Sequence, residues 1–170
     1  MKKLHKQKLF HSAVLFTLFI NAVYSGYIES DPFAFSFYIP GKYEKKTIEN
    51  NYGPFVLLSH PEGIMFVHFW ARKRPQGSDI SFLKEAYRLD FYNKFIAKET
   101  HPPEILKSEK NLQYSVSSVI LLEQHYENRV YYTRNGNFFY VLSIFIQEGK
   151  QGQVKEDVDM IMNSLSYGVR

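Results

Sequence analysis

The sequence predicts an α+β fold in which an antiparallel β-sheet is flanked by helices on both faces, that is, an α/β/α sandwich. The first observation is residues 137–146, NFFYVLSIFI, where Tyr140 and Leu142 point to one face of a strand and Phe139 and Val141 to the other. Both faces are apolar, which is typical of a strand that is covered on both sides. The second observation is a pair of segments with helical spacing that can supply the two covers.

The first 25 residues have the layout of a secretory signal peptide. Four lysines and no acidic residue lie in this segment, and an apolar run from Leu9 to Val23 is followed by small residues. The run is interrupted by His11 and Asn21 and is shorter than the roughly 20 residues that a membrane-spanning helix needs. We expect cleavage after Ser25, an exported protein that is periplasmic or secreted, and no stable membrane span after cleavage.

The charge and cysteine content of residues 26–170 exclude several classes of protein. Four of the 21 lysine and arginine residues lie in the leader, so the remainder carries 17 basic residues against 17 acidic ones. This balance argues against a nucleic-acid partner. The chain has no cysteine, so its fold does not depend on disulfide bonds, and it lacks the residue that anchors a bacterial lipoprotein.

Three strands are expected first. Residues 33–39 (FAFSFYI) are rich in aromatic side chains and end at Pro40 and Gly41. Residues 55–59 and 64–72 are joined by His60, Pro61, Glu62 and Gly63, which are typical of a tight turn. These two strands therefore form a predicted hairpin.

The spacing then changes to three and four residues at Ile80, Leu83, Tyr87, Phe91 and Phe95. This pattern predicts an amphipathic helix of about 18 residues, capped by Ser78 or Asp79. The sequence His101-Pro102-Pro103 is expected to end the helix and open a linker.

The last third of the chain predicts more strands and a second helix. Residues 114–123 and 129–134 have strand composition, and Asn135-Gly136 is a hairpin turn signal that leads into residues 137–146. The final one-sided helix is marked by Val154, Val158, Ile161, Met162 and Leu165.

Three of these segments resemble the PsbP-like family, which shares its fold with a Ran-binding nuclear transport factor. They are FSFYIPGKY (35–43), RVYYTRNGNFFYVL (129–142) and VDMIMNSLSY (158–167). The chain departs from the family pattern at Tyr43, where many members have tryptophan, and at Leu165, where phenylalanine is common. The resemblance covers residues 33–167 and implies one PsbP-like α+β domain over residues 26–170. It also implies an exported bacterial-type member that binds proteins or membrane complexes, and it carries over no catalytic residue.

The candidate partner-binding residues are aromatic or basic. Tyrosine suits protein interfaces because its ring is apolar and its hydroxyl forms hydrogen bonds. A short basic run suits an acidic partner, although it also fits a solvated strand end, and a sheet covered on both faces needs many large side chains in any case. The candidates are Tyr126, Tyr131, Tyr132, Arg72, Lys73 and Arg74.

Catalytic and metal-binding patterns are weak. His60, Glu62 and His68 lie close in sequence, but their spacing matches no recognised zinc pattern. Ser115 and Ser117 lie within a predicted strand and not on a nucleophile turn. We therefore expect no catalytic residue, no metal and no cofactor.

The sequence favours an exported, non-catalytic binding or accessory protein whose partner is an unidentified protein or envelope complex. Two alternatives stay open. An enclosed apolar cavity would favour a small-ligand carrier with an aromatic pocket, and a deep polar cleft containing His68 would favour a metal-dependent hydrolase.

Overall fold

The computed structural model describes residues 26–30, 33–50, 53–95, 98–109 and 111–167, so the predicted signal peptide lies outside the described residues. The elements in chain order are β1 (Gly26–Ser30), β2 (Phe35–Ile39), β3 (Glu44–Asn50), β4 (Gly53–Ser59), β5 (Met65–Lys73), α1 (Ile80–Phe95), β6 (Lys98–Glu109), β7 (Leu112–Leu121), β8 (Gln124–Asn135), β9 (Phe138–Gln147), a 3₁₀ turn (Gln151–Gln153), α2 (Lys155–Ser164) and β10 (Ser166–Tyr167).

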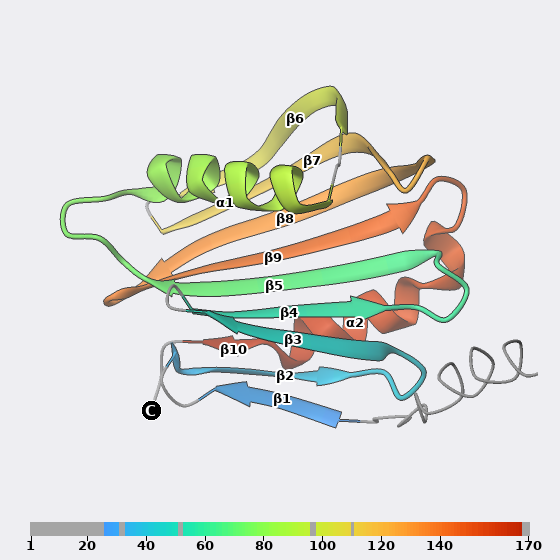
Figure 1. The fold of residues 1–170 in the computed structure, drawn as a ribbon, viewed down its shortest axis with the longest axis horizontal. Helices are drawn as coiled ribbons and strands as arrows, with labels where there is room; N and C mark the ends of the chain where they lie inside the picture. Colours follow the sequence, from blue (N-terminus) through green and yellow to red (C-terminus); the bar gives the residue numbers. More distant parts are fainter. Residues whose placement is uncertain (1–25, 31–32, 51–52, 96–97, 110, 168–170) are drawn as a thin grey trace, which may run out of the picture.

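Two antiparallel sheets organise these strands (Figure 1). The large sheet has seven strands in the order β3-β4-β5-β9-β8-β7-β6, and the small sheet has three in the order β1-β2-β10. The predicted hairpin of residues 55–59 and 64–72 is confirmed as β4–β5, with Gly63 N donating to His60 O at 2.8 Å across the turn. Asn135-Gly136 joins β8 to β9 as predicted, with Gly136 at a φ of 53° that favours glycine.

Strand β9 lies at the centre of the large sheet and is buried on both faces, as its composition predicted. It pairs with β5 on one side and with β8 on the other. Phe139 packs in the apolar cluster on the α1 face, and Tyr140 packs in the cluster on the opposite face. Two separate cores therefore meet at this one strand.

Helix α1 covers the first face (Figure 1). Its start is capped as predicted, because Phe82 N donates to Asp79 Oδ1 at 3.0 Å. Leu83, Tyr87 and Phe91 lie one turn apart and are buried against the sheet. The Phe91 ring stacks on Phe145 of β9 with 5.0 Å between the ring centroids.

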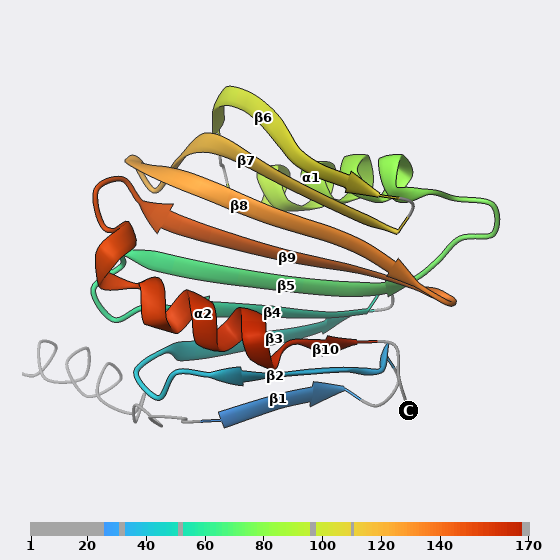
Figure 2. The ribbon, with the colours of Figure 1, turned by 180° about the vertical axis from the view of Figure 1, so that it is seen from behind.

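The small sheet and α2 cover the second face (Figure 2). Phe35, Phe37 and Ile39 alternate along β2 and are buried in that core, with 4.3 Å between the Phe35 and Phe69 ring centroids. Helix α2 is held beside β2 by a hydrogen bond of 2.9 Å from Tyr38 N to Ser164 Oγ.

The predicted α/β/α sandwich is wrong. The described residues lie mostly in strands of two sheets, and the layer opposite α1 is the small sheet with the short helix α2. Helical spacing identified both helices correctly, but spacing cannot show that β1, β2 and β10 pair with each other and not with the large sheet. That pairing places a sheet where a helical layer was expected.

The predicted linker after α1 is also wrong. Residues 101–103 belong to β6, which pairs with β7 and forms one edge of the large sheet. Proline is tolerated there because an edge strand has one side on which no backbone N–H is needed for pairing. The register between β6 and β7 shifts around this segment, which accommodates the two prolines.

Within the described part of the chain, no helix is long and apolar enough to cross a membrane.

Candidate functional site

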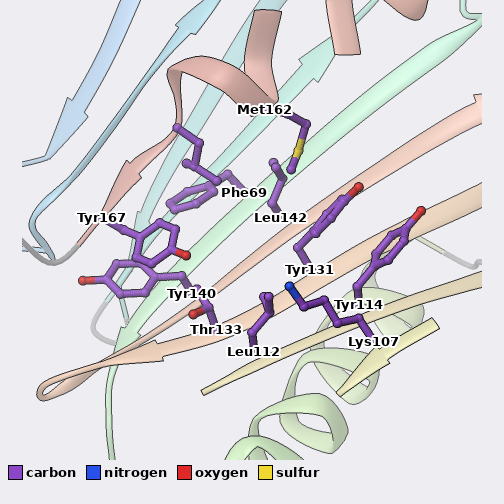
Figure 3. Close-up of a pocket in the computed structure, with 11 residues that line it drawn as sticks. Phe69, Lys107, Leu112, Tyr114, Tyr131, Thr133, Tyr140, Leu142, Met162 and Tyr167 are labelled. Carbon is purple, nitrogen blue, oxygen red and sulfur yellow. The ribbon is translucent and has the colours of Figure 1, made fainter. Parts of the chain in front are cut away.

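An open hollow of about 320 Å³ lies on the α2 face of the large sheet (Figure 3). Strands β5 to β9 form its floor, and α2 and β10 form the opposite wall. Its lining residues are mostly aromatic or aliphatic: Phe69, Lys107, Leu112, Tyr114, Tyr131, Thr133, Tyr140, Leu142, Met162, Leu165 and Tyr167.

Strand alternation brings these residues together. On β7, the residues at 113, 115 and 117 are buried on the α1 face, so Leu112 and Tyr114 face the hollow. Tyr114 and Tyr131 are direct partners in the β7–β8 register. Side chains of directly opposed residues lie on the same face of the sheet and touch.

Tyr114 and Tyr131 form a stacked pair with 4.4 Å between ring centroids and 11° between ring planes. Figure 3 shows the two rings side by side, with both hydroxyls at the same end. Burial raises the pKa of Tyr131, and the neighbouring Tyr114 raises it further, although Arg129 opposes this. Both effects keep the Tyr131 phenol protonated at neutral pH.

A second pair of rings closes the other end of the hollow. Tyr140 and Tyr167 lie 5.5 Å apart between ring centroids. The Tyr140 hydroxyl donates a hydrogen bond of 2.9 Å to Phe33 O, and burial raises its pKa. This end is therefore held by β9, β10 and the segment that leads into β2.

Lys107 of β6 is the charged residue among the described residues that line the hollow. Arg129, two residues before Tyr131, donates from Nε to Glu127 Oε1 at 2.5 Å. Burial lowers the pKa of Arg129, but Glu127, Tyr114 and Tyr131 outweigh it and raise the pKa overall. Arg129 therefore lies near the tyrosine pair as part of an ion pair, and Lys107 supplies the positive charge of the lining.

The three predicted tyrosines do not form one surface. Tyr126 and Tyr132 are 3% exposed and belong to the core beneath α1. Tyr131 lies on the opposite face of β8 and lines the hollow. The cause is the two-residue repeat of the strand, which separates Tyr131 from both of the others.

The side chains of the predicted basic run, residues 72–74, also lie in different surroundings. The Arg72 guanidinium carbon lies 5.4 Å from the centroid of the Trp70 ring, and Arg74 Nε donates to Ser78 O at 2.9 Å. Lys73 is exposed at the end of β5. Two of the three residues thus have structural contacts, and Lys73 is the most accessible of them.

His60 and His68 lie on opposite sides of the large sheet. His68 Nδ1 is 2.8 Å from the Tyr87 hydroxyl in the α1 core, whereas the His60 ring packs against Tyr43 of the other core, 5.3 Å between centroids. The two imidazoles therefore do not face a common site. Among the described residues, no group of three or more histidine, cysteine, aspartate and glutamate side chains could hold a metal ion.

The strand serines lie under α1. Ser115 and Ser117 are buried on β7, and the nearby Ser143 hydroxyl donates to Asn128 Oδ1 at 2.6 Å. The hollow contains neither these serines nor His68. The lining of the hollow therefore does not include the residues on which the hydrolase alternative depended.

Sequence reasoning identified Tyr131 but missed its neighbours. Tyr114 belongs to a predicted strand, and its alternation with buried positions could have placed it on the less covered face. Tyr140 lies on the strand that the predicted hairpin places beside Tyr131, whereas Lys107 and Tyr167 have no such signal, because they approach the site from distant strands.

No family model and no curated protein matches the chain. Among solved structures it is similar to cyanobacterial PsbP (CyanoP) from Synechocystis sp. PCC 6803, with a TM-score of 0.54 and 12% identity, covering 84% of this chain and 91% of that chain. It is also similar to a crystal structure from Bacteroides thetaiotaomicron VPI-5482, with a TM-score of 0.52 and 16% identity, covering 86% of this chain and 50% of that chain. At these identities the similarity concerns the fold alone. The chain has a PsbP-like fold, as the resemblance of its sequence implied.

Proposed function

We propose that this chain is an exported, non-catalytic accessory protein that binds another protein through the aromatic hollow. The observation that carries the proposal is the stacked pair Tyr114 and Tyr131, which lines a hollow at the margin of the core on the α2 face. Tyrosine is enriched where proteins bind each other, because it offers a large rigid ring and a polar hydroxyl.

The chemistry of the lining favours binding over catalysis. General acid–base catalysis needs a group whose pKa lies near the working pH, and phenols lie far above it. Burial raises the pKa of Tyr131 and of Tyr140, which moves both further away from neutral pH. The Thr133 hydroxyl donates a hydrogen bond of 2.8 Å to Asn111 O, which orients it away from a role as nucleophile.

The proposed place of action rests on the predicted leader. A basic and then apolar segment before Gly26 is typical of export, and the balanced charge of the remainder does not suit nucleic acid. The proposed partner is therefore a protein or complex of the cell envelope or exterior. Tyr131 and Lys107 are the proposed contact residues, whereas Tyr126 and Tyr132 are buried in the core on the opposite face of the sheet.

A small-ligand carrier is the second candidate. The volume of about 320 Å³ falls at the lower end of the range of roughly 300–1,000 Å³ found for ligand pockets. The hollow is only partly enclosed, however, and a carrier generally encloses most of the surface of its ligand. The incomplete enclosure favours a protein partner.

Site-specific photo-crosslinking in the native host separates the two functions. A photoreactive phenylalanine analogue replaces Tyr114 in the hollow or, as a control, Tyr38, which is 55% exposed on the small sheet. The proposal expects a discrete crosslinked protein from position 114 and not from position 38. Recovery of a small molecule bound to the purified protein, with no crosslinked protein, would instead support the carrier.

A further inference from the structure

We infer that Leu122, at the tip of the β7–β8 hairpin, is a second docking point for a protein and inserts into an apolar recess of that protein. The class of partner rests on the proposed function, but the surface is a different one. Tyr114 of the hollow lies near the start of β7, and Leu122 follows its last residue, roughly 20 Å away along the strand. Figure 1 shows the β7–β8 turn and the β8–β9 turn at opposite ends of the large sheet.

The backbone of the β7–β8 turn is unfavourable for the residues that it carries. Leu121 pairs with Gln124, so the turn consists of Leu122 and Glu123, with φ values of 51° and 64°. A two-residue hairpin turn with two positive φ angles strongly prefers Asn-Gly, Asp-Gly or Gly-Gly, because a Cβ is crowded in this region. The β8–β9 turn has Gly136 at such a φ, 53°. Leucine at position 122 therefore lowers the stability of the turn.

Burial within the fold does not offset this cost. Leu122 is 69% exposed and belongs to neither of the two apolar cores, whereas its neighbour Leu121 is 5% exposed beneath α1. A single exposed leucine is common on protein surfaces, but a strained backbone that local packing does not offset is concentrated at functional sites. Strain and exposure at the same residue indicate that the leucine side chain has its contact outside this chain.

The hairpin tip suits a protein better than a small molecule. Small ligands bind in concave sites that enclose most of their surface, and a projecting turn with a largely exposed side chain cannot enclose a ligand. A recess in a protein can instead enclose Leu122, and full burial of a leucine side chain is favourable. Leu122 is therefore the inserted group, and the partner supplies the apolar walls.

A lipid bilayer is a poorer match to the same tip. Even one acyl chain, which is much larger than a leucine side chain, binds a membrane only weakly and reversibly unless a second signal such as a basic cluster assists it. The described charged residues at the adjoining strand ends and turns are of both signs: Glu62, Glu123, Glu148, Lys98 and Lys150. This mixture does not provide the basic cluster that anionic lipid would attract.

Two substitutions separate the backbone strain from the side-chain contact. Leu122→Gly removes both the strain and the side chain, whereas Leu122→Ala removes most of the side chain but keeps a Cβ at a positive φ. In the exported protein purified from its host, the midpoint of urea unfolding should rise by about 0.2 M or more for Leu122→Gly and should not rise for Leu122→Ala. An unchanged or lower midpoint for Leu122→Gly would overturn the inference, because the leucine would then carry no conformational cost.

Photo-crosslinking in the native host tests the contact itself. A photoreactive phenylalanine analogue at position 122 should yield a discrete crosslinked protein, identified by mass spectrometry, and the same analogue at position 89 should not. Leu89 is the matched control because it is 57% exposed on α1. The identified protein, once purified, is the probe for titration with the exported chain. Leu122→Ala and Leu122→Gly should each weaken its binding by about tenfold or more, and Leu89→Ala should change it by less than about twofold.

Equal affinity of the wild type and of both position-122 variants for the identified protein would overturn the inference. Sedimentation of the wild type, but not of Leu122→Ala, with phosphatidylglycerol–phosphatidylethanolamine vesicles would overturn it in favour of a bilayer. Self-association that Leu122→Ala abolishes, measured by light scattering, would overturn it in favour of a second copy of this chain.

The two crosslinking positions distinguish this inference from the proposed function. A protein crosslinked at position 114 but not at position 122 would leave the proposed function standing and reject this inference alone. The reverse result would keep Leu122 as a docking point and reject the hollow as the binding surface. A crosslinked protein at neither position would reject both.

Discussion

Neighbouring residues of one strand belong to different cores, and Phe139 and Tyr140 are the clearest case. Phe139 is 0% exposed beneath α1, and Tyr140 is 1% exposed on the side of the small sheet. Each side chain is surrounded by apolar groups of a different layer. The fold therefore depends on burying both faces of β9 at once.

Substitution by aspartate tests this dependence. Phe139→Asp and Tyr140→Asp should each lower the free energy of unfolding by several kcal/mol, because each would bury an unpaired charge. Asn137→Asp adds the same charge at an exposed turn position and should change it by less than about 0.5 kcal/mol. Urea denaturation of the three variants measures the effect. A severe loss in only one of the first two would show that one face of β9 is dispensable.

We expect His60 to make the stability of the fold depend on pH. Its Nδ1 accepts a hydrogen bond of 3.1 Å from Glu62 N, which requires that this nitrogen carry no proton. Burial lowers the pKa of His60, Lys42 lowers it further, and Glu62 and Asp157 oppose the shift. The folded state therefore binds the proton less readily than the unfolded state does.

The contribution of His60 to stability should decrease as the pH falls. A pKa that is lower in the folded state makes the contribution of His60 fully present above the unfolded value of 6.5, and the contribution is lost as the pH falls below that value. His60→Asn keeps an acceptor for Glu62 N but cannot be protonated. Its unfolding free energy should fall less between pH 7 and pH 5 than that of the wild type. Parallel curves for the two proteins would contradict the assignment, and His101→Asn, at an exposed position, is the control.

At the scale of elements, α1 begins at a cap that the sequence already marked. Asp79 accepts from Phe82 N and so satisfies one of the backbone donors that a helix start leaves without a partner. The helix then places Leu83, Tyr87 and Phe91 on the sheet.

Two substitutions separate the cap from the charge of Asp79. Asp79→Ala should lower the free energy of unfolding by about 1 kcal/mol, because the donor loses its partner. Asp79→Asn keeps an oxygen at the same place and should stay close to the wild type. Thermal unfolding of both variants measures the difference. Equal losses in the two would mean that the charge, and not the hydrogen bond, stabilises the helix start.

Strand β6 shows where local patterns mislead. Its residues 101–103 contain two prolines, which are typical of a linker, yet the segment pairs with β7 along the edge of the sheet. The edge position removes the need for the missing N–H groups. An edge position is a property of the whole sheet, so no local window reveals it.

For the whole molecule, the predicted leader leads to a test of export. The predicted cleavage after Ser25 leaves β1 intact, since β1 begins at Gly26 and pairs from there with Ile39 of β2. Mass spectrometry of protein recovered outside the cytoplasm should find an N-terminus at Gly26 or within about three residues of it. An uncleaved leader in a membrane fraction would contradict the prediction and indicate an anchored protein.

Local pattern was sufficient for most individual elements. Two-residue alternation, three-to-four-residue spacing and the Asn135-Gly136 turn are consequences of backbone geometry, and each can be recognised within a few residues. They predicted both helices, the two hairpins and the double burial of β9. The PsbP-like fold was implied by the resemblance of three segments to that family, and the similarity to solved structures supports it.

Layering and the site depended on contacts between distant parts of the chain. Only the order of strands in the sheets decides that β2 and β10 form a separate layer, that β6 is an edge, and that Lys107, Tyr131 and Tyr167 line one hollow. Many strand orders satisfy the same local patterns, and the burial of apolar surface in two cores selects among them. A surface site built from four or more strands is therefore visible only after the chain has folded.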